Sequence, residues 1–175
     1  MKKMLILLFT IFSAVSFSEN VDIVIKNATV LTMDSKRTVI ENGVVAIKNN
    51  AIVEVGNGEL LSKYKGKKTI DAENDIVMPG FINTHTHVSM VAFRSLADDV
   101  PDRLSRYIFP LENKLVSRDL VYKGAVYGIL EMVSTGTTTF ADMYYFEDEV
   151  AKAAELIGVR GVLGETVIKN PVADA

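Results

Sequence analysis

The chain has 175 residues, of which 49% are apolar, and no segment is of low complexity, so one or two compact units are expected. The formal net charge of −3 becomes −5 without residues 1–18 (17 basic against 22 acidic residues), which argues against nucleic acid as a partner, because phosphate binding requires a basic face. The absence of cysteine excludes structural disulfides, a lipid-modified cysteine and cysteine-ligated zinc, so any metal must be held by nitrogen and oxygen.

Residues 1–18 have the pattern of an export signal. Two lysines open the segment, an apolar core follows from Met4 to Phe12, and the small-x-small sequence at 16–18 would leave Glu19 as the new N-terminus. The alternative is a membrane anchor, but the apolar run is shorter than the roughly 20 residues that a spanning helix needs. We therefore expect an exported protein, periplasmic or secreted, without a stable membrane anchor.

Residues 19–76 are expected to form a small β unit with a structural role, because no cluster of titratable side chains occurs there. Val21, Ile23 and Ile25 alternate with polar residues, as they do in half-buried strands. The Asn49-Asn50 pair is typical of a two-residue hairpin turn. The predicted elements are strands at 21–25, 28–33, 43–47, 51–55 and 69–71, with one helical turn at 60–64.

Both histidines of the chain lie in the stretch Met78-Pro79-Gly80-Phe81-Ile82-Asn83-Thr84-His85-Thr86-His87. Pro79 favours an extended Met78, and Gly80 permits a sharp turn before a short strand. Because side chains alternate along a strand, the spacing places both imidazoles on one side, about 6.5–7 Å apart along the backbone. Two neutral imidazoles on one face can hold a divalent metal. On spacing alone, two surface histidines without a metal are the more common outcome.

A long connection is expected after the second histidine. Apolar residues from Val88 to Arg94 have helical spacing, residues 98–102 break it, and a short helix at 103–108 is expected to end at Phe109-Pro110. In barrel enzymes, long loops at the C-terminal ends of strands build the substrate pocket. Glu112 follows in this connection, and its simplest role is that of an exposed carboxylate in the first turn of a helix.

The remaining sequence alternates between helices and strands. Ser117 is a good N-cap for a helix that extends to Ser134, and further elements are a strand at 137–143, a helix at 147–157 closed by Gly158, and a strand at 159–167. This order predicts parallel pairing with right-handed crossovers, the opening of a (β/α)₈ barrel. Asp142 is the only carboxylate expected to approach the histidines, and hydrogen bonding to a neighbouring loop is its more common role.

The segment from Pro79 to His87, with Met90, Arg94, Ala97-Asp98-Asp99 and Pro110-Leu111-Glu112, resembles the amidohydrolase superfamily. Within it, the sequence is most similar to methylthioadenosine/S-adenosylhomocysteine deaminases and related chlorohydrolases, from about Val21 to the end. The resemblance implies an α/β protein in which part of a small β-sandwich (19–76) precedes the start of an incomplete (β/α)₈ TIM-type barrel (77–175). The signal peptide (1–18) is expected from the pattern of its own residues. The resemblance also implies zinc or another divalent transition metal at His85 and His87, and a Glu112 that accepts hydrogen bonds from ribose hydroxyls.

The resemblance implies a metal-dependent hydrolase that acts on non-peptide carbon–nitrogen bonds. The expected substrate is a small molecule, an aminated purine nucleoside or a related heterocycle, and an oligomer is compatible with the sequence. Because the family takes further ligands and proton-transfer residues from later strands, we expect an N-terminal fragment, and the catalytic residues are not identified. The alternatives are an inactive fragment or pseudoenzyme, and a secreted β-rich binding module. No serine or cysteine triad, Walker loop or dinucleotide fingerprint is present.

Overall fold

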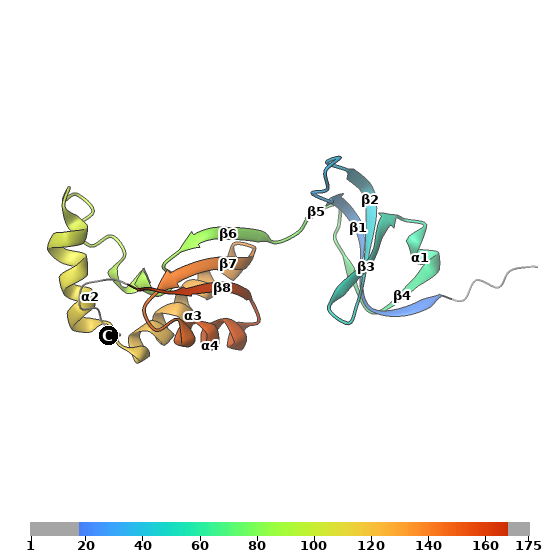
Figure 1. Ribbon diagram of the computed structural model, residues 1–175. Coiled ribbons are helices and arrows are strands. Elements are labelled where there is room, and N and C mark those ends of the chain that lie inside the picture. The colour runs from blue at the N-terminus through green and yellow to red at the C-terminus, as the bar shows by residue number, and fades with distance from the viewer. Residues whose placement is uncertain (1–17, 168–175) are drawn as a thin grey trace, which may run out of the picture. The chain divides into compact units, whose positions relative to one another are not determined.

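The computed structural model describes residues 18–167, which form two compact units that divide between Pro79 and Gly80 (Figure 1). The sequence analysis places the corresponding boundary between residues 76 and 77. Residues 1–17 of the predicted export signal lie outside the described residues. Within the described range, no helix is both long enough and apolar enough to cross a membrane.

The first unit is built on a five-stranded sheet with the order β3-β2-β1-β4, in which β5 also pairs with β1. The β1–β2 and β2–β3 pairs are antiparallel, whereas β4 and β5 run parallel to β1. Buried apolar side chains form one cluster around Val24 and another around Val45. The strands are β1 (Glu19–Leu31), β2 (Val39–Lys48), β3 (Ala51–Asn57), β4 (Tyr64–Asp71) and β5 (Ile76–Val77).

Asparagines with positive φ shape this sheet. The prediction of two separate strands on either side of Asn27 is wrong, because Asn27 adopts φ 54° and β1 continues through it. The register with β2 shifts between Ile25 and Ala28, as expected where a bulge interrupts a strand. The predicted hairpin turn is confirmed: Asn49 and Asn50 have φ values of 51° and 63°, which suit a two-residue turn between paired strands.

The end of the first unit differs from the prediction in two places. The single helical turn is confirmed as α1 (Leu60–Lys63). The strand predicted around residues 69–71 starts earlier, at Tyr64, whose side chain is buried. The two-residue strand β5 was not predicted, since Ile76 and Val77 are too few to show an alternating pattern.

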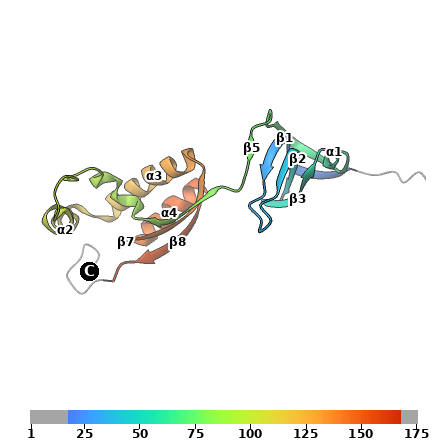
Figure 2. The same ribbon diagram turned by 90° about the horizontal axis from the view of Figure 1, so that it is seen from above.

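The second unit contains a parallel sheet, β6-β7-β8, with α3 and α4 against one face (Figures 1 and 2). This confirms the predicted alternation of helices and strands with parallel pairing. The last strand is shorter than predicted and ends at Glu165. The elements are β6 (Phe81–Thr86), α3 (Arg118–Ser134), β7 (Thr137–Tyr144), α4 (Glu147–Ile157) and β8 (Arg160–Glu165).

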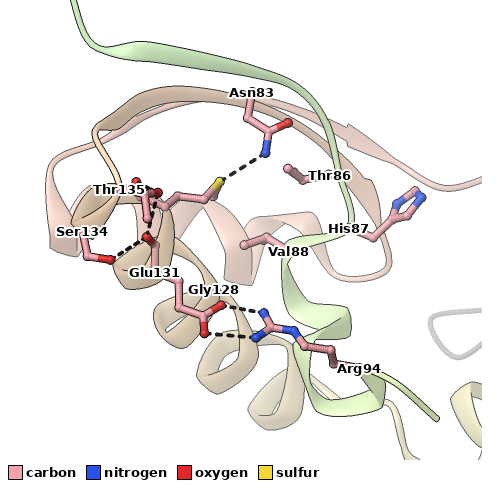
Figure 3. Close-up of a pocket in the computed structure, with 10 residues that line it drawn as sticks. Asn83, Thr86, His87, Val88, Arg94, Gly128, Glu131, Ser134 and Thr135 are labelled. Atoms are coloured by element: carbon pink, nitrogen blue, oxygen red, sulfur yellow. Dashed lines mark hydrogen bonds and ion pairs between the residues drawn. The ribbon is translucent and has the colours of Figure 1, made fainter. Parts of the chain in front are cut away.

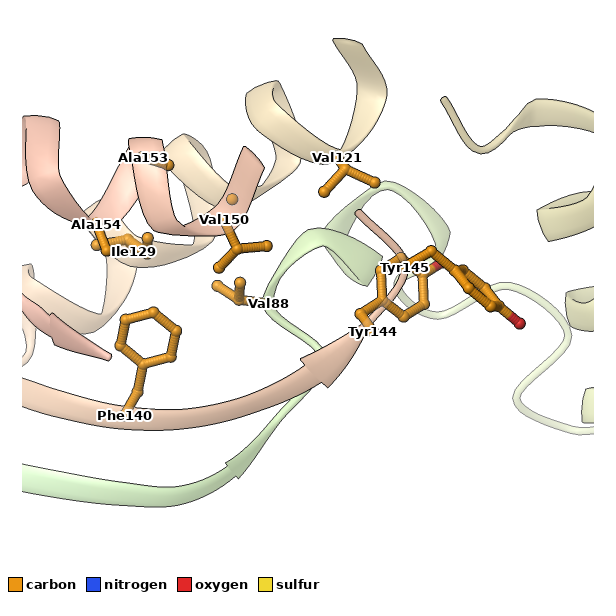
Figure 4. Close-up of a cluster of buried hydrophobic side chains, with 10 residues drawn as sticks. Val88, Val121, Ile129, Phe140, Tyr144, Tyr145, Val150, Ala153 and Ala154 are labelled. Atoms are coloured by element: carbon orange, nitrogen blue, oxygen red, sulfur yellow. The ribbon is translucent and has the colours of Figure 1, made fainter. Parts of the chain in front are cut away.

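The core of the second unit lies between this sheet and the two helices. Phe140 of β7 is fully buried and points toward Ile129 of α3 and Ala154 of α4 (Figure 4). Some apolar side chains of the sheet do not join this core and are exposed, including Ile82 on β6 and Val162 on β8. The buried members of the core are Val88, Val121, Ala125, Ile129, Phe140, Tyr144, Tyr145, Val150, Ala153 and Ala154.

The connection between β6 and α3 contains three helical segments. The predicted stop at Phe109-Pro110 is wrong, because the π-helical turn η2 (Leu104–Ile108) continues directly into α2 (Phe109–Leu115). Pro110 lies in the first turn of α2, within this continuous helical stretch. A 3₁₀ segment, η1 (Val88–Phe93), follows β6 directly and confirms the helical spacing predicted there.

Candidate functional site

The two histidines lie together at the C-terminal end of β6. His85 is in the strand and His87 follows its last residue, so the spacing of two brings both rings to the same place, as predicted. The ring centroids are 5.2 Å apart and the ring planes are nearly perpendicular, at 89°. His85 is exposed and His87 is half-buried. Both rings are therefore reachable by a solute at this end of the sheet.

The ring of His87 is oriented by the neighbouring strand. Its Nδ1 atom lies 2.5 Å from the carbonyl oxygen of Met143 in β7. Because a carbonyl can only accept a hydrogen bond, this contact requires the proton to be on Nδ1, which leaves the lone pair of Nε2 free. Metal-binding histidines usually donate their second ring N–H to a carbonyl or carboxylate in this way. The donor chemistry of His87 thus fits a metal ligand.

Asp142 lies on β7 opposite Thr86 in the register of the two strands. One of its carboxylate oxygens, Oδ1, accepts hydrogen bonds from the Val88 backbone N–H at 2.8 Å and from the Thr86 hydroxyl. Asp142 therefore contacts the residues on both sides of His87. Among residues 18–167, no group of three or more histidine and acidic side chains is arranged to hold a metal ion.

A mostly apolar cavity of about 290 Å³ adjoins His87. Side chains from the connection after β6 and from the ends of β7 and β8 line it, which agrees with the expectation that this connection builds a pocket. Glu112 is one of the lining residues, so Asp142 is not the only carboxylate that approaches the histidines. The lining residues are His87, Met90, Leu104, Ile108, Phe109, Glu112, Met143, Tyr144, Tyr145 and Thr166.

Glu112 is a buried pocket residue, only 3% exposed, rather than an exposed helix-end carboxylate. Its Oε1 accepts a hydrogen bond from the Tyr144 hydroxyl at 2.8 Å. Burial raises the pKa of Glu112, and the Tyr144 hydrogen bond and the nearby His87 partly oppose that rise. The pKa of Tyr144 is also raised, mainly by burial and in second place by its hydrogen bond to Glu112. Tyr144 therefore remains a hydrogen-bond donor at neutral pH, and Glu112 is the matching acceptor.

A second, more open cavity of about 590 Å³ lies between β6 and α3. Arg94 and Glu131 form an ion pair across it with two nitrogen–oxygen contacts, and Asn83 reaches the Met132 sulfur (Figure 3). The ring of His87 points away from this group of side chains (Figure 3). We therefore assign the chemistry to the smaller cavity, which contains Glu112.

Glu147 is a buried acid that the sequence analysis identified only as the start of a helix. It is 5% exposed, and its backbone N–H donates to the Glu165 carboxylate at 2.9 Å. Burial, followed by the charge of Asp142, raises the pKa of Glu147 to about 8. Three acidic residues in the first turn of α4 are common at helix N-termini, so nothing in the sequence distinguishes this one.

Comparisons with known proteins found a matching family model and similar proteins. The sequence model of the Amidohydrolase family matches residues 76–174. The 5-methylthioadenosine/S-adenosylhomocysteine deaminase 1 of Syntrophus aciditrophicus (strain SB) is 43% identical over 156 residues, which cover 87% of this chain and 35% of the relative. A 5'-deoxyadenosine deaminase of Methanosarcina mazei is 45% identical over 150 residues, covering 85% of this chain and 34% of the relative.

The fold is also similar to solved structures. The crystal structure of an adenosine deaminase from Xanthomonas campestris with bound zinc superposes with a TM-score of 0.87 and 31% sequence identity. The superposition covers 90% of this chain and 37% of that one. The chain thus spans about a third of the length of the curated relatives that it matches.

Proposed function

The chain belongs to the amidohydrolase family, and from this premise we propose that it forms the metal-binding and substrate-binding start of a hydrolase acting on non-peptide carbon–nitrogen bonds. The proposed reaction is deamination of an aminated purine nucleoside or a related heterocycle. The names of the similar deaminases support this substrate class. In this proposal, the three parallel strands are the first three of an eight-stranded barrel.

The observation that carries the proposal is the orientation of His87. Its Nδ1–H faces the Met143 carbonyl, which leaves Nε2 free, and its ring centroid lies 5.2 Å from that of His85. Imidazole nitrogens suit zinc and other divalent transition metals, and the absence of cysteine leaves nitrogen and oxygen donors only. We propose that His85 and His87 supply two ligands. Catalytic zinc usually has three protein ligands, so a further one is required.

The pocket residues have separate proposed tasks. The Tyr144 hydroxyl occupies Oε1 of Glu112, which leaves Oε2 to accept hydrogen bonds from ribose hydroxyls. Apolar side chains such as Ile108 and Phe109 contact the heterocycle and exclude water. A divalent metal held by the two histidines would supply Lewis-acid activation of the water that the hydrolysis consumes. In the balanced reaction, a carbon–oxygen bond forms and the carbon–nitrogen bond breaks. The leaving amino group takes one proton of the water to become ammonia, and the other hydrogen stays on the product.

A chimera tests the proposal, because a similar deaminase supplies the remaining barrel. Residues 80–167 of this chain would replace the matching segment of the Syntrophus aciditrophicus relative, and release of ammonia from 5-methylthioadenosine would be measured together with zinc content. We expect turnover in the chimera and its loss, with loss of most bound zinc, in His85→Ala and His87→Ala versions. Thr84→Ala, an exposed neighbour on the same strand, is the matched control.

Two results would contradict the proposal. Unchanged zinc content and turnover in both histidine variants would remove these residues from the site. A folded, zinc-loaded chimera without turnover would favour a catalytically inactive chain, an alternative supported by the two-histidine donor set within the described residues. A β-rich binding module receives less support, because the second unit has the β-α-β order of a parallel sheet.

We also propose that the chain is exported, on the basic, apolar and small-residue pattern of residues 1–18. The first strand begins at Glu19, so cleavage after Ser18 would leave β1 intact. N-terminal sequencing of the protein recovered from its producing cells is expected to start at Glu19. An intact Met1 on the mature protein would contradict export by cleavage.

A further inference from the structure

We infer that Asp142 and Glu147, referred to here as the carboxyl pair, are positioning residues that hold the loop carrying His87 and so set the direction of its free nitrogen. This inference rests on the proposed function, because it gives His87 the role of a metal ligand. Neither acid contacts the proposed substrate pocket, since both are absent from its lining. Their role is therefore exerted through the histidine loop.

The first step of the argument is the contact between Asp142 and the loop. Its Oδ1 accepts from the backbone N–H of Val88 and from the hydroxyl of Thr86, the two residues that flank His87. The same Thr86 hydroxyl also lies 2.9 Å from the Ala141 carbonyl oxygen, so its single proton is shared between two acceptors on β7. With both neighbours fixed, the backbone of His87 has little freedom to turn.

The second step concerns what holds Asp142. Within the described residues, Asp142 Oδ2 and both carboxylate oxygens of Glu147 are buried and lack a hydrogen-bond partner. One shared proton would satisfy Asp142 Oδ2 and one oxygen of Glu147, because a protonated Glu147 then donates to Asp142. The pKa of Glu147, raised to about 8 by burial and by Asp142, supports this arrangement. The Glu165 carboxylate on β8 also opposes ionisation of Glu147.

The third step links the carboxyl pair to the ring. Asp142 and Met143 are consecutive residues of β7: one holds the loop and the other accepts the Nδ1–H of His87. If the loop moves away from β7, the ring loses the carbonyl that selects its tautomer. Measuring which nitrogen of His87 carries the proton therefore shows whether the carboxyl pair holds the loop, without any metal being needed.

The experiment uses the full chain without a tag, because its two histidines give only two sets of imidazole NMR signals. Long-range ¹⁵N–¹H spectra at about pH 7.5, above the ordinary histidine pKa, distinguish the Nδ1–H and Nε2–H tautomers. We expect Nδ1–H for His87 in the parent and in Asp142→Asn, since the amide oxygen still accepts and the amide nitrogen can donate to Glu147. In Asp142→Ala we expect a mixture of tautomers.

Zn²⁺ titration of the same samples measures how strongly each variant binds the metal. Loss of partners around a metal ligand typically weakens metal binding by about 10-fold to 100-fold. We expect a loss in this range in Asp142→Ala and near-parent binding in Asp142→Asn. Ala153→Gly, in the buried face of α4, is the matched control: it destabilises the same unit without contacting the loop and should change neither reading.

The outcomes separate this inference from the proposed function. An unchanged His87 tautomer in a folded Asp142→Ala variant would overturn the inference. If that variant does not fold, Thr86→Val decides instead, because it removes one of the two loop contacts while keeping the side-chain shape; a parent-like tautomer there would overturn it equally. If Zn²⁺ shifts neither ring in the parent, two histidines alone do not hold the ion and the chimera decides the proposed metal site, while the tautomer comparison still judges the carboxyl pair.

Discussion

Glu147→Gln tests the buried acid through the pH dependence of stability. The pKa of Glu147 is raised from 4.5 to about 8 in the folded chain, first by burial and then by Asp142. Below about pH 4.5, both folded and unfolded states hold the proton. Between about pH 4.5 and about pH 8, only the folded state holds it, so the free energy of unfolding falls as pH rises. Above about pH 8, both states are ionised and the loss levels off.

The size of the effect follows from the same values. At about pH 7, the unfolded carboxyl is about 2.5 pH units above its pKa, and each unit corresponds to about 1.4 kcal/mol, which gives a loss on the order of 3 kcal/mol relative to acid pH. The glutamine side chain in Glu147→Gln cannot ionise, and its amide can donate to Asp142 at every pH. We therefore expect the variant to lose the pH slope and to be more stable than the parent near pH 8.

The assay is urea unfolding at several pH values from about 5 to about 8, followed through NMR signals of the second unit. The control is Glu149→Gln in the same helix. Lys152 and Arg118 lower the pKa of Glu149, so its contribution is complete above the ordinary glutamate pKa, and the variant should lower the whole curve without changing its slope. Parallel curves for Glu147→Gln and the parent would refute the reasoning.

Three further outcomes are expected. Glu112→Gln in the chimera should weaken nucleoside turnover by about 1.5–3 kcal/mol, the range for hydrogen bonds to a charged group, and equal losses on the free base would assign Glu112 to the scaffold instead. Tyr144→Phe should cost about 1–3 kcal/mol in urea unfolding, because Glu112 loses its buried donor, whereas Glu112→Gln should cost less since the amide still accepts. Gly80→Ala should cost about 1–3 kcal/mol, because its Cβ would lie 2.2 Å from Thr138 Cγ2, and a Thr138→Ala change in the same chain should restore most of the loss.

Local signals in the sequence account for the elements that were predicted correctly. Helix α4 was predicted with the right bounds because acidic residues mark its first turn and Gly158, at φ 83°, ends it. Ser117 caps α3 by accepting from the Leu120 N–H, as predicted. The errors arose at residue types that occur both at the end of a helix or strand and within one. Pro110 starts a helix rather than ending one, and Asn27 bends a strand that continues through it.

The sequence analysis correctly singled out Gly80, but the physical reason for a glycine there is different. The sequence analysis expected it to permit a sharp turn, yet it is not among the described residues with positive φ. Its role is close approach, because a side chain there would collide with Thr138 of the neighbouring strand. Gly80 and Thr138 are far apart in the sequence, so their contact leaves no local pattern and cannot be predicted from residue spacing.

In the candidate site too, the parts set by local spacing could be predicted from the sequence, and the parts set by the register of distant strands could not. His85 and His87 were predictable because two residues on one strand end share a side regardless of the rest of the fold. The other contacts come from three consecutive residues of β7: Asp142 holds the loop, the Met143 carbonyl orients His87, and Tyr144 binds Glu112. All three depend on one register, since a slip of one residue would turn the Asp142 and Tyr144 side chains to the opposite face and move the Met143 carbonyl away from His87.

No hairpin fixes that register, because the strands are parallel and joined by long connections. Phe140 provides a physical reason for it: the ring is fully buried between β7 and the two helices, on the face that also carries Asp142 and Tyr144. Moving this ring to the exposed face would remove it from the core and forfeit about 1.5–3 kcal/mol of apolar burial. The packing of one aromatic side chain thereby aligns the histidine loop, the His87 ring and the Glu112 pocket together.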